Sequence, residues 1–384
     1  MSFFEVFKQE LRTIFSDFAI VLTIIGGVLL YAFLYPQPYM KQNVTAIPIA
    51  VVDNDRSDIS RDIAFHLQAN PQIGTLYQLL SQKEALEYLK TQKIKGYVVI
   101  PKDFKRDMLL LKQPKVKIGV DGSYFLVYGG VVESSLGAIV SEIVKQKVAS
   151  SLKQQVPLSL LQNYLQTFKV EIINLFNPNS SYTQYVLPAV FVLILQQTLL
   201  IGLGIVGGGI NEQAYKGYDY DVKTQYVIFS RYIIFLILFL FHFLFYFGFV
   251  FDLFDIYHSG KLDEIVFFGV IYFSAVIALG LFFGALMKQR EIATPLVLFS
   301  SLILVFSVGF VWPKEMIPFF VIYLSEFFPS TPGIEGFLKL NQLGANIKDI
   351  EPSLYILIIQ IVVYMFLAFS VLEYKRKNKK TTDI

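Results

Sequence analysis

Six long apolar stretches constrain this chain more than any other feature. A helix that crosses a lipid bilayer needs roughly 20 mostly apolar residues, because its backbone polar groups must be satisfied within the helix. The stretches that meet this condition are residues 18–35, 186–210, 232–251, 265–287, 292–312 and 353–372. Only 16% of the residues are charged, whereas about a quarter is usual in soluble domains. We therefore predict an α-helical polytopic membrane protein with six transmembrane helices.

The first stretch could be mistaken for a cleaved signal peptide. It continues into Tyr-Pro-Gln-Pro-Tyr and has no small-x-small cleavage site, which favours a retained anchor. The preceding residues 1–16 are amphipathic, because apolar side chains recur at helical spacing: Phe3, Phe7, Leu11, Ile14 and Phe15. We expect a helix along the inner membrane surface. The alternative is a simple extension of the first spanning helix.

Lys and Arg in the short flanks predict the orientation of the spans. The outer loops hold only Lys261, Lys314, Lys339 and Lys348. The opposite flanks hold many more: Lys8, Arg12, Lys216, Lys223, Arg231, Lys288, Arg290, Lys375, Arg376, Lys377, Lys379 and Lys380. Both ends of the chain are therefore predicted to be cytoplasmic, with a basic tail at residues 373–384.

Residues 36–181 are polar enough to form a soluble domain outside the membrane. Strands are predicted at 47–52, 96–100 and 116–120, a further short apolar run at 76–80, and helices near 57–69, 84–90 and 104–111. A long helix is expected at 124–153 and an amphipathic one at 158–176, which together could form a stalk. Alternating strands and helices predict an inserted extracytoplasmic α/β domain.

Several motifs of this region occur in a set order. They are Ala50-Val-Val-Asp-Asn-Asp-Arg-Ser57, Ile59-Ser-Arg61, Tyr97-Val-Val-Ile-Pro101 with Phe104, and Val120-Asp-Gly-Ser123. In this order, between one span and five later ones, they resemble the extracytoplasmic domain of type-2 ABC exporter permeases, whose ATPase is a separate chain. The resemblance divides the chain into residues 1–35, 36–181 and 182–384. Within this domain, Asp53 and Asp55 suit a turn at a strand end, although they could also bind a cation.

The resemblance implies a coupling segment after the second span, within residues 208–224, on which the ATPase rests. The candidate residues are Asn211, Glu212, Gln213, Tyr215, Lys216 and Gly217. A plain interhelical loop is the alternative. The glycines before it, Gly202, Gly204 and 207–209, are expected to let helices pack closely. The resemblance also covers Gly309, Pro313 and Met316-Ile-Pro318, and within residues 313–351 the run 317–328 is too short to span and suits a re-entrant or interfacial helix.

Polar side chains inside spans are candidates for a translocation path. Gln196 and Gln197 lie in the middle of the second stretch, and His242 in the middle of the third. Hydrogen bonding between helices is the alternative for the glutamines, and packing is favoured for His242. The phenylalanines around His242 are expected to face lipid or neighbouring helices.

The sequence offers no route to an enzyme active site. It contains no Gly-x-x-x-x-Gly-Lys-Ser/Thr, His-Glu-x-x-His or Gly-x-Ser-x-Gly motif, no cysteine, and three scattered histidines. We therefore expect no catalytic, metal or cofactor site in this chain, with ATP and Mg²⁺ bound by the partner. A net charge of +3 does not suggest nucleic acid as a partner.

The resemblance implies an exporter permease in a bacterial inner membrane, active in efflux of a hydrophobic or amphipathic substrate such as a drug or lipid. Implied partners are a second copy or a paralogue, cytoplasmic ABC ATPase subunits, and in double-membrane bacteria a periplasmic adaptor and outer-membrane channel. The alternative is a non-transporting scaffold or receptor of the phage-receptor or type-seven-secretion type. Such proteins usually have much longer outer domains.

Overall fold

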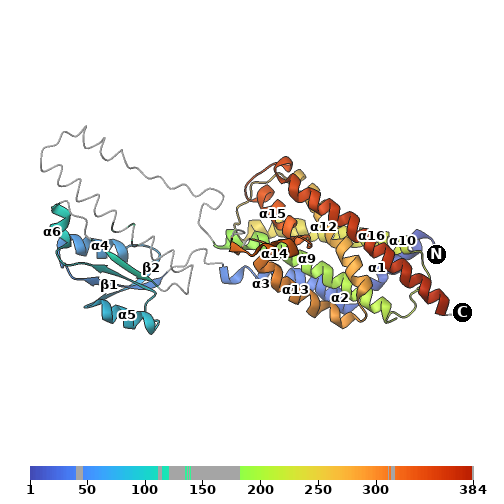
Figure 1. Ribbon diagram of the computed structural model, residues 1–384, viewed down its shortest axis with the longest axis horizontal. Helices are drawn as coiled ribbons and strands as arrows, with labels where there is room; N and C mark the ends of the chain where they lie inside the picture. Colours follow the sequence, from blue (N-terminus) through green and yellow to red (C-terminus); the bar gives the residue numbers. More distant parts are fainter. Residues whose placement is uncertain are drawn as a thin grey trace. The chain divides into compact units, whose positions relative to one another are not determined.

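The computed structural model describes residues 1–39, 46–110, 115–120, 182–309, 311–312 and 316–382, with the isolated positions 135, 137 and 139. The chain divides into two compact units. Met1–Met40 and Asn174–Ile384 form a helical bundle, and Lys41–Ile173 form a unit that contains a β-sheet (Figure 1). Each unit has its own hydrophobic core.

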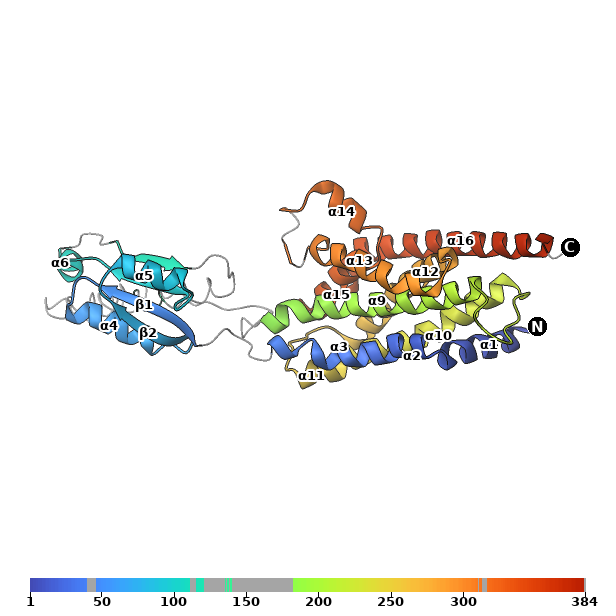
Figure 2. The ribbon, with the colours of Figure 1, turned by 90° about the horizontal axis from the view of Figure 1, so that it is seen from below.

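The bundle confirms a polytopic membrane protein. Five helical segments among the described residues are long and apolar enough to cross a membrane, or six if a bent pair forms one span. The bundle contains α1 (Phe3–Ser16), α2 (Phe18–Val21), η1 (Leu22–Gly27), α3 (Val28–Leu34), α9 (Tyr182–Asn211), α10 (Thr224–Leu244), η3 (Phe245–Val250), α11 (Phe251–Leu253), α12 (Leu262–Leu286), η4 (Arg290–Ile292), α13 (Ala293–Ser307), α14 (Phe319–Ser325), α15 (Ser330–Asn341), η6 (Ile347–Ile350) and α16 (Glu351–Thr382). Both ends of the chain lie at the same end of this bundle, which we call the terminal end (Figure 2).

The first helices are sharply bent at Asp17. Its Oδ1 accepts hydrogen bonds from the amides of Ala19 at 2.9 Å and Ile20 at 3.4 Å, so that α2 starts afresh with its own cap. The bend is 75°. Helix α1 is therefore separate, and not the simple extension that the sequence left open. Its exposed side carries Phe4, Leu11 and Phe15, but Ile14, expected on that side, is buried in the bundle.

Helix α9 is the central element of the bundle. Its apolar stretch is almost wholly buried, and it packs against α12, α13 and α15. Its glycines permit this packing, because a methyl group added to each would lie 2.2–2.8 Å from a neighbouring atom. The neighbours are Ile24 for Gly202, Ala293 for Gly204, Gly284 for Gly207, Arg290 for Gly208 and Tyr215 for Gly209. The expected role of small residues in helix packing is thus confirmed.

The fifth apolar stretch is shorter than predicted. Helix α13 ends at Ser307, whereas the hydropathy pattern continues to residue 312. Gly309 has φ +97°, a conformation that L side chains rarely adopt and that cannot continue a right-handed helix. The apolar pattern therefore overestimated the helix, because hydropathy does not register a change in backbone conformation.

The region expected to be re-entrant forms two short helices, α14 and α15. Thr331 Oγ1 donates to the Ser325 carbonyl at 2.7 Å, and Gln360 Nε2 of α16 donates to the Glu326 carbonyl at 2.7 Å. These bonds fix the turn between α14 and α15 on α16. Helix α15 is largely buried, whereas α14 exposes Phe319 and Phe320.

The second unit contains a four-stranded sheet of order β2-β1-β3-β4. Its elements are β1 (Ile47–Asp53), α4 (Asp58–Gln68), β2 (Ile73–Leu79), α5 (Gln82–Lys90), β3 (Gly96–Ile100), α6 (Phe104–Leu109) and β4 (Lys117–Val120). Strand β1 pairs in parallel with β2 and β3, and β4 is antiparallel to β3. Side chains of β1 alternate between two clusters, one shared with α4 and α6 and one with α5.

The strands predicted at 47–52, 96–100 and 116–120 are present, and so are the three short helices. The apolar run at 76–80 is largely strand β2. The two long helices expected at 124–153 and 158–176 lie outside the described residues, apart from three positions. One of these, Ile139, is buried in the cluster beside α4 and α6.

Candidate ATPase-coupling site

The segment after α9 begins with a tightly anchored helix end. Asn211 Nδ2 donates to the carbonyl of Met287 at 2.6 Å and to that of Ala285 at 3.4 Å, so that the ends of α9 and α12 are joined. The chain then turns at Gln213, which has φ +56°, and the Ala214 amide donates to the Gly209 carbonyl at 2.8 Å. Asn211 is therefore an anchor of the segment.

Tyr215 folds back against the helix that precedes it. Its ring occupies the space beside Gly209 that a larger residue would fill, and its hydroxyl is buried. Burial raises the pKa of this hydroxyl above its ordinary value, so that it stays protonated. Tyr215 thus also holds the turn in place.

The remaining candidate residues form the exposed tip of the turn. Glu212, Gln213, Lys216 and Gly217 are all exposed. Gly217 has φ +74°, and apart from its chain neighbours no atom of the described residues lies within 4 Å of where its Cβ would be. An exposed tip on a fixed base is suited to contact another protein. We call the segment from Asn211 to Gly217 the tip segment.

Residues after the tip segment attach it to α1. The Gln9 side chain exchanges two hydrogen bonds with the backbone of Asp219, at 3.0 and 3.2 Å. The Tyr218 hydroxyl donates to the carboxylate of Glu10. Burial, and then the Glu10 charge, raise the pKa of Tyr218. The N-terminal helix and the loop after α9 therefore form one connected structure.

A buried ion pair completes this connection. Arg231 of α10 donates from Nε to Glu10 Oε2 at 2.9 Å and from Nη2 to Oε1 at 3.2 Å. Both side chains are almost fully buried. Sequence reasoning missed both residues, because Arg231 was counted only as a flanking charge. The available signal was an arginine eight residues into a spanning helix.

The residues proposed for a translocation path lie inside the bundle. Gln196 is buried, Gln197 is half-buried, and His242 is buried with its ring edge-on to Phe239 at 5.3 Å. Gln196 Oε1 and His242 Nδ1 have no hydrogen-bond partner among the described residues. None of the three lines the two cavities described below, so their role in a path stays a prediction.

Asp53 and Asp55 are used within a turn. Asp53 Oδ1 accepts from the amides of Asp55 at 3.0 Å and Arg56 at 2.9 Å, and its Oδ2 accepts from Ser60 Oγ at 2.8 Å. Asp55 Oδ2 accepts from the Lys105 amide at 3.1 Å. The described residues contain no cluster of His, Cys, Asp and Glu able to hold a metal ion. These bonds support the turn interpretation over the cation site.

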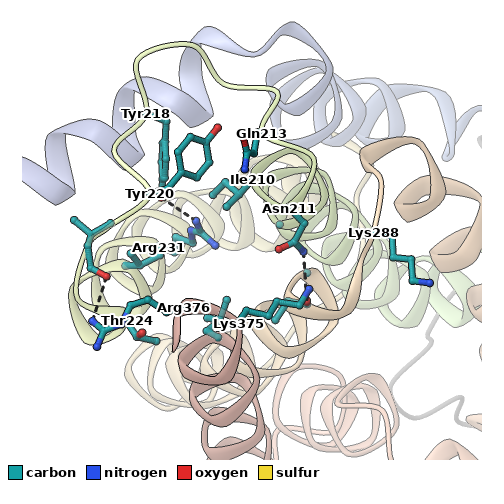
Figure 3. A pocket seen from close by; sticks show the side chains of 16 residues that line it. Ile210, Asn211, Gln213, Tyr218, Tyr220, Thr224, Arg231, Lys288, Lys375 and Arg376 are labelled. Atoms are coloured by element: carbon teal, nitrogen blue, oxygen red, sulfur yellow. Dashed lines mark hydrogen bonds between the residues drawn. The ribbon is translucent and has the colours of Figure 1, made fainter. Parts of the chain in front are cut away.

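Two of the cavities lined by described residues of the bundle bear on the site. One, of about 430 Å³, is apolar and lies between α13 and α14, lined by Phe306, Trp312 and Pro318 among others. The other, of about 570 Å³, lies at the terminal end behind the tip segment (Figure 3). Its lining includes four cationic side chains, Arg231, Lys288, Lys375 and Arg376.

The long apolar helices define an integral membrane protein. An exposed turn is fixed to the ends of two of them, α9 and α12. The chain belongs to the ABC-2 family of transporter proteins, whose family model matches residues 18–370. This match includes both units and begins directly after Asp17, so that α1 lies outside it. No curated protein matches the chain significantly. Membership of this family makes the chain a transporter membrane subunit that works with an ATPase subunit.

Proposed function

We propose that this chain is the permease subunit of an ATP-driven exporter that moves a hydrophobic or amphipathic substrate out of the cytoplasm or the inner membrane. Separate subunits bind ATP and Mg²⁺ and hydrolyse the nucleotide. The observation that carries the proposal is the tip segment, whose exposed residues stand on a base anchored to α12 and, through Tyr218 and Asp219, to α1. A docking surface must be bonded to the spanning helices in this way if a movement of the ATPase is to move those helices.

The proposal includes the orientation and the assembly. The terminal end is cytoplasmic, because the basic flanks lie there. Helices α13 and α16 expose many apolar side chains, which suits contact with lipid and with a second copy or a paralogue. The unit at residues 41–173 lies outside the cytoplasm, where a periplasmic adaptor and outer-membrane channel would receive the substrate. The family match favours this permease over a phage receptor or secretion scaffold.

The experiment is co-purification of the full chain with an ABC ATPase, followed by measurement of substrate-stimulated hydrolysis. Charge reversal at the tip, Glu212→Lys or Lys216→Glu, should weaken binding of the ATPase and the stimulation. Both residues are exposed, so the variants should fold normally. Lys8→Gln, an exposed lysine of α1, is the matched control. Unchanged stimulation in both reversal variants would argue against the tip segment as the docking surface.

A further inference from the structure

The cavity at the terminal end has an unbalanced positive charge. Its lining includes four cationic residues and no carboxylate, although the Lys288 side chain points away from the opening (Figure 3). Two of the cations are paired with acidic residues outside the lining, Arg231 with Glu10 and Arg376 with Glu373. The other two, Lys288 and Lys375, have no ion pair among the described residues. Lys375 Nζ donates only to the Ala285 carbonyl, at 2.6 Å.

Several donor groups around this cavity are unused. Arg231 bonds through Nε and Nη2, which leaves Nη1 without a partner among the described residues. Arg376 Nε is buried and also lacks a partner there. Lys375 retains two of its three donors. Figure 3 shows Arg231 and Lys375 extending towards the opening from different helices, α10 and α16.

The ligand should therefore be an anion with several acceptor oxygens. A phosphate group combines one or two negative charges with oxygens that accept from Arg and Lys at short range. The volume of about 570 Å³ is within the range of sites for small ligands. Tyr220, Thr224 and Gln213 add neutral polar groups to the lining. An apolar ligand would leave the half-buried Lys375 charge without a counter-ion.

We propose that this cavity, between α9, α10, α12 and α16, binds the phosphate group of an anionic ligand. The phosphate would come from the headgroup of an anionic phospholipid or from a soluble phosphate compound. Occupation would link Lys375 of α16 to Arg231 of α10 behind the tip segment. This proposal does not depend on the exporter function, because binding is measured without an ATPase or a transport substrate.

The test uses the purified full chain in detergent. Native mass spectrometry measures binding of phosphatidylglycerol against phosphatidylcholine, and thermal unfolding is followed with inorganic phosphate against chloride at equal ionic strength. We expect a preference for phosphatidylglycerol or a stabilisation by phosphate. Lys375→Gln should weaken that binding roughly fivefold, as expected for one basic residue near an anionic lipid. Lys288→Gln should leave it nearly unchanged, because the Lys288 side chain is exposed and points away from the opening (Figure 3). Lys375→Arg should retain it, and Lys8→Gln is the control.

The lipid measurement and the inorganic phosphate measurement distinguish the two possible sources of the phosphate group. Binding of phosphatidylglycerol that inorganic phosphate does not displace identifies a lipid headgroup, and stabilisation by inorganic phosphate identifies a soluble ligand. The proposal is overturned if neither probe binds better than its control, or if Lys375→Gln folds and binds as the unchanged protein does. The comparison of each probe with its control on the unchanged protein tests the cavity even if Lys375→Gln fails to fold.

Discussion

Glu10 and Arg231 are 221 positions apart in the sequence, yet their side chains form a two-point ion pair with both residues almost fully buried. The pair fastens α1 to α10. Tyr218, which donates to the same carboxylate, brings the loop after the tip segment into this contact. Helix α1, which precedes the residues matched by the family model, is therefore bonded to Tyr218 and Arg231, which the model includes.

Removing one partner of this pair should be strongly destabilising. Glu10→Gln leaves the Arg231 charge buried without a counter-ion, at a cost of about 3–5 kcal/mol. Thermal unfolding of the purified protein in detergent, followed by size-exclusion chromatography, would show a large decrease in the midpoint temperature. Glu212→Gln, at an exposed position, serves as control. The double variant Glu10→Leu with Arg231→Leu should recover part of the loss, and no recovery would argue that lost hydrogen bonds, not the unpaired charge, dominate.

The crossing of α9 and α12 should not tolerate an added methyl group. A Cβ on Gly207 would lie 2.2 Å from the carbonyl oxygen of Gly284, so that the helices must move apart. Such overpacking costs about 1–3 kcal/mol or more. We expect Gly207→Ala to lower the yield of monodisperse protein and its unfolding temperature.

Gly248 provides the matched control for this substitution. It also lies in a spanning helix, but outside its own helix backbone no atom of the described residues lies within 4 Å of its added Cβ. Gly248→Ala should be neutral or stabilising by up to about 1 kcal/mol, because alanine favours helical backbone. An equal loss of stability in the two variants would contradict the role given to the contact between Gly207 and Gly284.

Within the tip segment, we expect the residue that stabilises the fold to differ from the residue that contacts the ATPase. Asn211→Ala removes the bonds to the Ala285 and Met287 carbonyls and should cost about 1–3 kcal/mol. Glu212→Gln should change stability by less than about 0.5 kcal/mol, because the side chain is exposed. Unfolding temperature and ATPase stimulation, measured on both variants, check the distinction. The prediction is wrong if Glu212→Gln unfolds at a lower temperature than Asn211→Ala.

The turn at Asp53 should depend on hydrogen bonding and not on a metal ion. Asp53→Ala leaves the Asp55 and Arg56 amides without their acceptor, while the Ser60 hydroxyl keeps the Ser57 carbonyl, and should destabilise its unit by about 1–3 kcal/mol. Limited proteolysis of the full chain would show faster cleavage in this unit. Glu87→Gln, on the exposed side of α5, is the control. A large effect of a chelator on the unchanged protein would instead indicate a bound cation.

The spans were predictable because lipid imposes a simple rule on composition and length. The strands β1 and β3 were predictable because β-branched runs end at turn residues such as Asp53 and Pro101. Helix α15 was not predicted, since its sequence mixes Gly333, Gly336 and Lys339 with apolar residues and has no clear period.

Pairings between distant residues could not be obtained from local patterns. The glycines of α9 indicated close packing, but not that Gly207 meets Gly284 or that Gly209 meets Tyr215. The candidate coupling residues were a continuous segment in the sequence, and the structure separates them into an anchored base and an exposed tip. That division depends on Ala285 and Met287, which follow 74 and 76 residues after Asn211.

The burial of α9 has a consequence for biosynthesis. This helix leaves the ribosome before α12, α13 and α15, the elements that cover it. Until they are made, the backbone at Gly204 and Gly207, which later packs against Ala293 and Gly284, faces lipid or an insertion factor. Truncated chains that stop before α12 should therefore be recognised by membrane quality control, whereas loss of the residues after Asn378, beyond the bonds made by Glu373, Lys375 and Arg376, should be tolerated.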